Sequence, residues 1–168
     1  FILFIPLLAI ANAGADLRPI GESGLPLPRF VSIAQSEANM RRGPGAQYPL
    51  IWQYTRRGWP LEIIAEHGRW RKIRDHEGAQ GWMHARLLRG KRTIIIRPQA
   101  HHQAHHQALA LRTRPQADAG TVALVQMGVV GQLKKCRGNW CAVSLGGYDG
   151  WLPRAQLWGV YDFEFSDK

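Results

Sequence analysis

The sequence predicts an all-β fold made of two small β-barrels in tandem, joined by a short linker. The first observation behind this prediction is an internal repeat with a spacing of about 70 residues. The second is that each copy consists of short segments rich in β-branched and aromatic residues, separated by Gly, Pro, Asn or Asp. Helical periodicity is absent over any useful length. About five short strands per copy favour a barrel, whose closure removes exposed sheet edges.

The first segment, residues 1–13, reads as the C-terminal part of a secretory signal peptide. An uncharged apolar run from Phe1 to Ile10 precedes Ala11-Asn12-Ala13, which has small residues where a signal peptidase requires them. The run is too short to span a membrane, which needs about 20 residues, and no later stretch is apolar enough to do so. We therefore expect a periplasmic or secreted protein with no membrane span in the mature chain. An apolar N-terminal strand is the less favoured alternative.

The repeat is clearest at two glycine-tryptophan motifs. Gly68-Arg69-Trp70 matches Gly138-Asn139-Trp140, and Gly81-Trp82 matches Gly150-Trp151. The first motif lies between extended segments in both copies, so we expect hairpin turns at 67–69 and 137–139. Two tryptophan pairs at matched separations from glycine are not expected by chance.

Further motifs connect the first copy to a known family. Asn39-Met40-Arg41 precedes the turn Gly43-Pro44-Gly45, Tyr48-Pro49 follows it, and the closing Gly81-Trp82 precedes Leu87-Leu88. This pattern resembles the bacterial SH3-like (SH3b) domain, and the whole chain resembles exported tandem SH3-like proteins of proteobacteria. Residues 31–93 match well. Residues 108–161 match less closely, because Arg114 replaces Gly43 and the Tyr-Pro pair is missing.

The resemblance implies two SH3-like domains, 31–93 and 108–161, joined by a His-rich linker at 94–107. It also implies a binding module, often associated with cell-wall peptides or glycans, and not an enzyme. We expect the first domain to provide the binding surface, for peptidoglycan or for a peptide of a partner protein, and the second domain to support it. The resemblance does not supply a ligand.

The positive charge is concentrated in the first domain. Residues 29–97 contain 14 of the 22 Lys and Arg residues and only 5 of the 12 Asp and Glu residues. A body of this charge attracts anionic polymers, such as wall glycans, lipid headgroups or nucleic acid. Export makes nucleic acid the least expected of these partners. Nonspecific polyanion binding is therefore an alternative function.

Aromatic and arginine side chains of the first copy are the candidate ligand-binding residues. Small β-barrels hold sugars, peptides and bases on aromatic faces. Arginine adds planar donors suited to carboxylates and phosphates. The three chosen aromatics have no aromatic counterpart in the second copy, as expected of a groove present in one copy only. The predicted ligand-binding set is Tyr48, Trp52, Tyr54, Arg41, Arg56 and Arg57. Trp82 and Trp151, which recur in both copies, are expected to pack within the fold.

The segment QAHHQAHHQA, residues 99–108, gives a second functional hypothesis. If this segment is helical, His101 and His105 share a face, as metal ligands do. The candidate metal ligands are His101, His102, His105 and His106. A low-complexity linker with incidental histidines is the favoured reading, because no Cys or carboxylate within the segment completes a ligand set.

Cys136 and Cys141 flank the second hairpin turn, so we expect a cross-hairpin disulfide in an oxidising compartment. With both cysteines bridged, neither is free as a nucleophile, and no serine lies in a nucleophile-elbow motif. His67, His76 and His84 are expected at the surface, and turn chemistry explains Asp75 and Glu77 as well as an acid pair would. The sequence therefore predicts no enzymatic activity and no cofactor.

Overall fold

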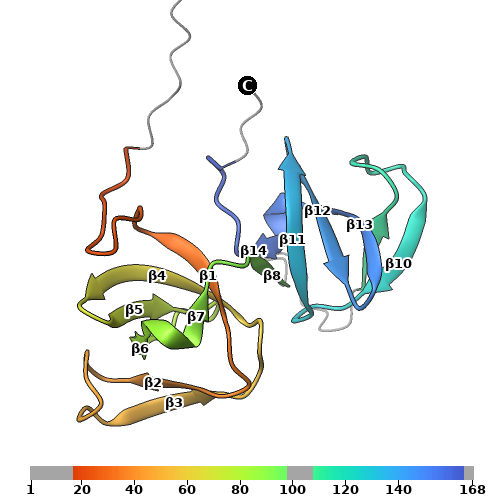
Figure 1. The fold of residues 1–168 in the computed structure, drawn as a ribbon. Coiled ribbons are helices and arrows are strands. Elements are labelled where there is room, and N and C mark those ends of the chain that lie inside the picture. The colour runs from red at the N-terminus through yellow and green to blue at the C-terminus, as the bar shows by residue number, and fades with distance from the viewer. Residues whose placement is uncertain (1–16, 98–107, 165–168) are drawn as a thin grey trace, which may run out of the picture.

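The computed structural model describes residues 17–97 and 108–164. They form two antiparallel seven-stranded sheets, each curled into a small barrel (Figure 1). The first sheet contains β1 (Arg29–Ile33), β2 (Ala38–Arg41), β3 (Leu50–Tyr54), β4 (Pro60–His67), β5 (Trp70–Arg74), β6 (Gln80–His84) and β7 (Leu88–Arg89). The second contains β8 (Thr93–Ile96), β9 (Leu109–Arg112), β10 (Thr121–Val125), β11 (Val130–Arg137), β12 (Trp140–Leu145), β13 (Tyr148–Pro153) and β14 (Leu157–Trp158). The all-β fold is confirmed.

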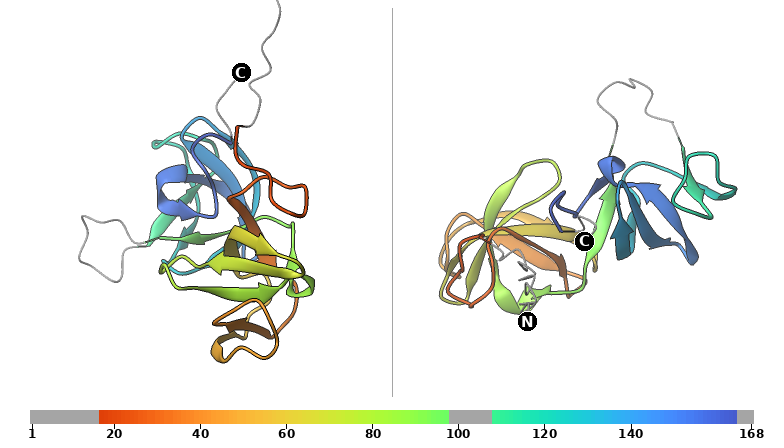
Figure 2. Two further views of the ribbon diagram at one scale, coloured as in Figure 1. Left: turned by 90° about the vertical axis from the view of Figure 1, so that its left-hand side faces the viewer. Right: turned by 90° about the horizontal axis from the view of Figure 1, so that it is seen from above.

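Both barrels have the same topology, and they lie side by side (Figure 2). The strand orders are β3-β2-β6-β5-β4-β1-β7 and β10-β9-β13-β12-β11-β8-β14, so β8 takes the place of β1. Short 3-10 turns, η1 (Ala85–Leu87) and η2 (Arg154–Gln156), precede the last strand of each sheet. Both expected hairpins are present, with His67 opposite Trp70 and Arg137 opposite Trp140.

The boundary between the barrels differs from the expected one. β8 pairs with β11 and β14, so the second sheet begins at Thr93, the residue expected to end the first domain, and β8 continues into the range 94–107 expected to be a linker. The first sheet begins at Arg29 and ends at Arg89. The physical reason is that Ile94 and Ile96 of this β-branched run are buried in the second core. The histidine-rich segment therefore lies between two strands of one barrel. Its histidines, like residues 1–13, fall outside the described residues.

Each barrel has its own apolar core, in which alternate strand residues point inward. In the two closing strands the fully buried residues are Met83 and Leu152, while Trp82 and Trp151 are half-buried. The expectation that these tryptophans pack inside the fold is met only in part. They follow the inward-facing glycines by one residue, so they point to the opposite face of the sheet.

The glycines of the repeat have a structural reason. A Cβ on Gly81 would lie 2.9 Å from the Arg41 carbonyl oxygen, and one on Gly150 would lie 2.8 Å from that of Arg112. Only glycine lets β6 approach β2, and β13 approach β9, this closely. Gly68 and Gly138, in the hairpin turns, have φ of 52° and 51°, a region that favours glycine.

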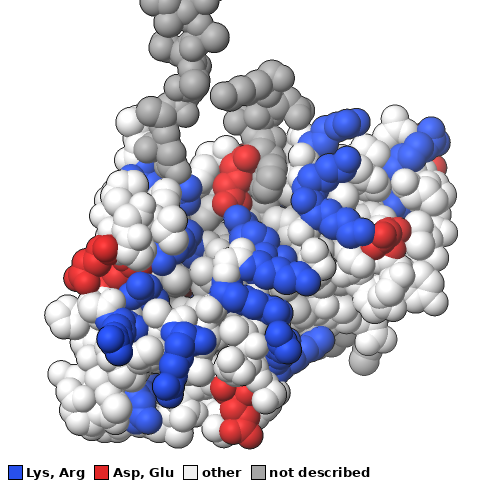
Figure 3. Space-filling view, viewed as in Figure 1, with Lys and Arg blue, Asp and Glu red and all other residues white. Residues whose placement is uncertain are grey.

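Basic side chains spread over the surface viewed in Figure 3. Lys and Arg lie across the first barrel and continue onto the second, with few acidic groups between them. This distribution agrees with the excess of basic residues between 29 and 97. Within the described residues, no helix is long and apolar enough to cross a membrane.

Candidate functional site

The site lies where the two barrels meet, and aromatic rings build this junction. Trp158 ends β14 and contacts Phe30 of β1 at a ring separation of 4.9 Å. Tyr161, in the segment after β14, lies 4.4 Å from the same ring. Phe30 is buried under both rings, and Arg92 lies over it at 5.4 Å. An apolar residue of the first barrel is thus covered by the last strand of the second barrel and by the segment after it.

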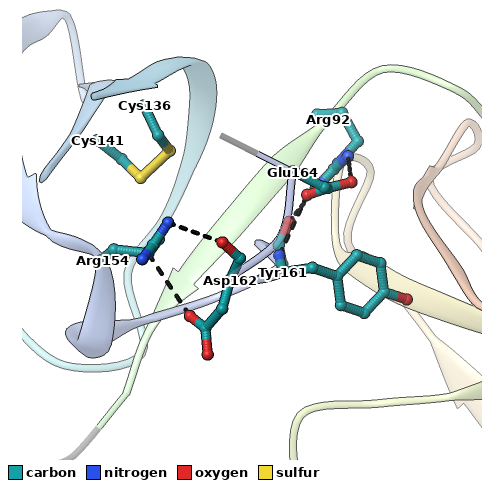
Figure 4. Close-up of a disulfide and its surroundings, with 8 residues drawn as sticks. Arg92, Cys136, Cys141, Arg154, Tyr161, Asp162 and Glu164 are labelled. Atoms are coloured by element: carbon teal, nitrogen blue, oxygen red, sulfur yellow. Dashed lines mark hydrogen bonds and ion pairs between the residues drawn. A yellow bond between two sulfur atoms is a disulfide. The ribbon is translucent and has the colours of Figure 1, made fainter. Parts of the chain in front are cut away.

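Ion pairs hold the segment 159–164 in position between the barrels (Figure 4). Arg92, in the connection between the barrels, donates to both carboxylate oxygens of Glu164, at 2.7 and 2.9 Å. Arg154 donates to the Asp162 carbonyl at 3.1 Å. Bidentate arginine pairs of the first kind add geometric specificity as well as energy. The segment that contains Tyr161, which packs on Phe30 of the first barrel, is therefore held in a defined position.

A groove of about 350 Å³ opens at this junction, and we call it the junction groove. Its lining residues come from the end of β3, the loop before β4, the turn after β5 and two points of the second barrel. They are Trp52, Gln53, Tyr54, Thr55, Arg56, Trp59, Asp75, His76, Glu77, Ile95 and Gly128. The groove thus includes residues of both barrels, whereas the sequence predicted a binding surface on the first alone.

Trp52 is the most exposed aromatic of the groove, with 58% of its surface accessible. It lies on β3, the edge strand of the first sheet, between the exposed residues Ile51 and Gln53. Arg56 is also exposed, and its guanidinium lies 5.7 Å from the centre of the Trp59 ring. A stacking face and a planar cation are therefore both accessible at one groove.

Tyr54 has a different role from the one expected. Only 7% of its surface is accessible, and its hydroxyl donates to Asp75 at 3.0 Å. Burial, together with the charge of Asp75, raises the pKa of Tyr54 above its ordinary value. Asp75 also accepts from the backbone N–H groups of Glu77 and Ala79, at 3.1 and 2.9 Å. Tyr54 and Asp75 thus support the wall of the groove, and Tyr54 is mainly a core residue.

Two buried polar atoms of the groove-lining side chains have no partner among the described residues. They are Nε1 of Trp59 and Nδ1 of His76, and the two rings meet edge to face at 5.4 Å. His76 also meets Trp158 of the second barrel at 6.3 Å. It is therefore half-buried between two tryptophans, not at the open surface as expected. Unsatisfied buried polar atoms of this kind are uncommon in folded proteins.

The other predicted ligand-binding residues do not line the groove. Tyr48 is 40% exposed in the turn between β2 and β3, where its carbonyl accepts from Arg41 at 2.8 Å. Arg57 is exposed and follows Arg56 in the loop before β4. The structure therefore brings together Trp52, Tyr54 and Arg56, and leaves Tyr48, Arg41 and Arg57 outside.

The predicted disulfide is confirmed, whereas the predicted metal ligands lie in a segment that the structure does not describe. Cys136 and Cys141 form a disulfide across the β11–β12 hairpin. His101, His102, His105 and His106 lie outside the described residues, so metal binding there stays a prediction. Within 17–97 and 108–164, no group of three His, Cys, Asp or Glu side chains could hold a metal ion.

Sequence reasoning missed Trp59, His76 and the contributions of the second barrel. Trp59 had a usable signal, because Val129 stands at the matching position and so Trp59 has no aromatic counterpart in the second copy. His76 had none, since a histidine in a turn gives no sign of a neighbouring barrel. Ile95 and Gly128 follow only from how the barrels dock.

The fold defines the class of protein: a tandem pair of small β-barrels with a shared groove. The family model described as the bacterial SH3 domain matches residues 34–90 and 106–159, so the chain belongs to this family and contains two copies. No curated protein matches the chain. A proteobacterial source stays a prediction.

Among solved structures, the chain is similar to two proteins of Trichomonas vaginalis. NlpC2 is 9% identical with a TM-score of 0.35, covering 84% of this chain and 51% of that one. NlpC1 is 8% identical with a TM-score of 0.33, covering 85% and 49%. The chain thus spans about half the length of either protein. At these TM-scores, neither likeness supports an argument about function.

Proposed function

We propose that the protein is a non-catalytic binding module of the cell envelope that holds a wall peptide or glycan, the material of peptidoglycan, in the junction groove. The observation that carries this proposal is Trp52, an aromatic ring 58% exposed on a groove of about 350 Å³. Exposed aromatics beside a groove are how proteins commonly gain contact area with sugars and peptides.

The other groups of the groove suit such a ligand. Arg56 offers a planar donor to a carboxylate of a wall peptide. The unpartnered Nε1 of Trp59 and Nδ1 of His76 provide hydrogen-bonding capacity that a polar ligand or a bridging water would use. Bacterial SH3 domains are cell-wall binding modules, which agrees with this ligand class.

Three features support the absence of catalysis and an exported location. Both cysteines are in the disulfide, so neither is a free nucleophile. Asp75, the better placed acid of the groove, already accepts three hydrogen bonds, including that from Tyr54. A disulfide is typical of proteins outside the reducing cytoplasm.

Co-sedimentation with insoluble peptidoglycan sacculi, over a range of salt concentrations, tests the proposal. We expect the sacculi to retain the protein at moderate salt. The Trp52→Ala variant should bind them with an apparent affinity lower by at least about tenfold. Tyr54→Ala is unsuitable for this purpose, because Tyr54 is buried and its loss destabilises the barrel.

Tyr148→Ala is the matched control, since Tyr148 is 57% exposed and lies outside the groove. It should bind sacculi as the unmodified protein does. Equal retention of the Trp52→Ala and Tyr148→Ala variants would show that the junction groove is not the binding surface.

A second candidate is nonspecific polyanion binding, which the uneven charge favours. In that case, retention falls steeply with salt and is indifferent to the chemistry of the polymer. The salt series of the same experiment separates the two candidates.

A further inference from the structure

A second hollow in the surface differs from the junction groove in its lining, which includes four arginines. Its volume is about 480 Å³, and we call it the arginine pocket. The arginines come from four segments: Arg29 from β1, Arg71 from β5, Arg89 from β7 and Arg92 from the connection to the second barrel. None of these lines the junction groove.

Acidic partners neutralise only part of this charge. Glu66, whose side chain is almost fully buried, pairs with Arg29 at 2.5 Å and with Arg71 at 3.2 Å. Arg92 is occupied by Glu164. Among the described residues, no carboxylate pairs with Arg89, whose Nε donates to the Ser32 hydroxyl at 3.3 Å. The four guanidinium groups of the pocket thus have two carboxylates as ion-pair partners.

A histidine beside the arginine pocket has a lowered pKa, and Arg71 is the one arginine among its causes that lines the pocket. His84 ends β6, directly before Ala85, which lines the pocket. Burial lowers the pKa of His84, and the charges of Arg86, Arg69 and Arg71 lower it further.

We propose that the arginine pocket binds a phosphate group, with Arg89 as its principal contact. Arginines from several directions suit a tetrahedral group with several acceptor oxygens better than a planar carboxylate, which one guanidinium fork can satisfy. The terminal nitrogens of Arg89 are the donors left for this group, and the surrounding arginines add attraction. This site is independent of the proposed wall-binding function.

A nuclear magnetic resonance titration of the purified protein with sodium phosphate, at constant ionic strength against sodium chloride, tests this proposal. We expect saturable shifts at the Arg89 side chain and at the backbone of β1 and β7. Arg89→Gln should weaken phosphate binding about tenfold, because a charge-assisted contact is lost. Arg89→Lys, which keeps the charge but not the fork, should give an intermediate affinity and guards against a folding artefact.

Arg137→Gln is the matched control, since Arg137 is exposed on the second barrel and its loss removes the same charge. It should bind phosphate as the unmodified protein does. The proposal is overturned if sodium chloride alone produces the same chemical-shift changes. It is also overturned if Arg89→Gln and Arg137→Gln weaken phosphate binding equally. Trp52→Ala should bind phosphate normally, so failure of one site is distinguished from failure of the other.

Two further arms identify the source of the phosphate. Co-sedimentation with phosphatidylglycerol vesicles but not phosphatidylcholine vesicles, lost in Arg89→Gln, supports the site and assigns it to a lipid headgroup. Saturation by inorganic phosphate without vesicle binding supports the site and assigns it to a soluble phosphate or phosphate ester. No binding in either arm overturns it.

Discussion

The Tyr161 hydroxyl donates a hydrogen bond of 2.7 Å to the Glu62 carboxylate, and the two residues belong to different barrels. Glu62 is buried on β4 and also accepts from Arg74 at 2.8 Å. Tyr161 follows the last strand of the second barrel and packs on Phe30 of the first. One bond therefore joins a buried acid to the segment that closes the junction. The same segment follows Trp158, whose ring contacts His76 of the junction groove.

Tyr161→Phe tests the energetic weight of this contact. The variant keeps the ring on Phe30 but removes a hydrogen bond to a buried carboxylate, so we expect a loss of about 1–2 kcal/mol in the free energy of unfolding. Urea unfolding at neutral pH measures it. Tyr148→Phe, a change at an exposed tyrosine, is the control and should shift stability by less than about 0.5 kcal/mol. A similar result for both variants would mean that the Tyr161 hydroxyl does not stabilise the junction.

Stability should fall at high pH because of two tyrosines. Burial raises the pKa of Tyr161, as does its bond to Glu62, and burial with Asp75 raises that of Tyr54. The folded state therefore favours the protonated phenols. The stability that they contribute is complete below the pKa of a tyrosine in the unfolded chain, about 10. It is lost as the pH rises above that value.

Urea unfolding between about pH 9 and about pH 11 checks this expectation. Each tyrosine should lower the free energy of unfolding by up to about 1.4 kcal/mol per pH unit in the upper part of that range. The double variant Tyr54→Phe, Tyr161→Phe should have a flatter profile than the unmodified protein. Identical slopes would contradict the role of these phenols.

Stability should also fall in acid because of Glu66. Its side chain is 1% exposed, and burial alone opposes ionisation, but hydrogen bonds from Ser23 and Arg29 lower its pKa to about 2. The contribution of Glu66 is thus complete above its ordinary value of 4.5 and is lost as the pH falls from there toward 2. It amounts to at most about 3 kcal/mol.

Glu66→Gln should remove much of this acid dependence and lower stability at neutral pH. Chemical denaturation along a pH series measures both effects. Glu37→Gln, at an exposed position, is the matched control and should leave the profile as it is. A Glu66→Gln variant that loses stability in acid as steeply as the unmodified protein would show that another group is responsible.

The strands and hairpins were predictable because local chemistry determines them. Gly81 and Gly150 recur in the sequence because each permits a close approach of two backbones. Gly68 and Gly138 recur because their turns need positive φ. The disulfide was predictable for a similar reason, since Cys136 and Cys141 flank a turn whose strands must pair.

The site was predictable only in part, because it depends on contacts far apart in the sequence. Trp52 and Arg56 were found as a local cluster without counterparts in the second copy. Tyr54 belongs to the same cluster, but it packs in the first core and its hydroxyl bonds to Asp75, 21 residues away. The start of the second barrel at Thr93 was missed because the strand β8 is separated from β9 by the histidine-rich segment. Sequence alone cannot reveal which barrel a solitary strand joins.

Reduction of the disulfide should weaken the second barrel and leave the first unaffected. Cys136 and Cys141 are five residues apart, and closing so short a loop is expected to stabilise the fold by about 2 kcal/mol. Calorimetry with and without a reducing agent should show a lower unfolding temperature for the second barrel. The Cys136→Ala, Cys141→Ala variant should match the reduced protein and no longer respond to reductant.

If reduction destabilised both barrels equally, the contacts of Tyr161 and Glu164 would be coupling them into one cooperative unit. Reduction would then also weaken binding at the junction groove, although neither cysteine lines it.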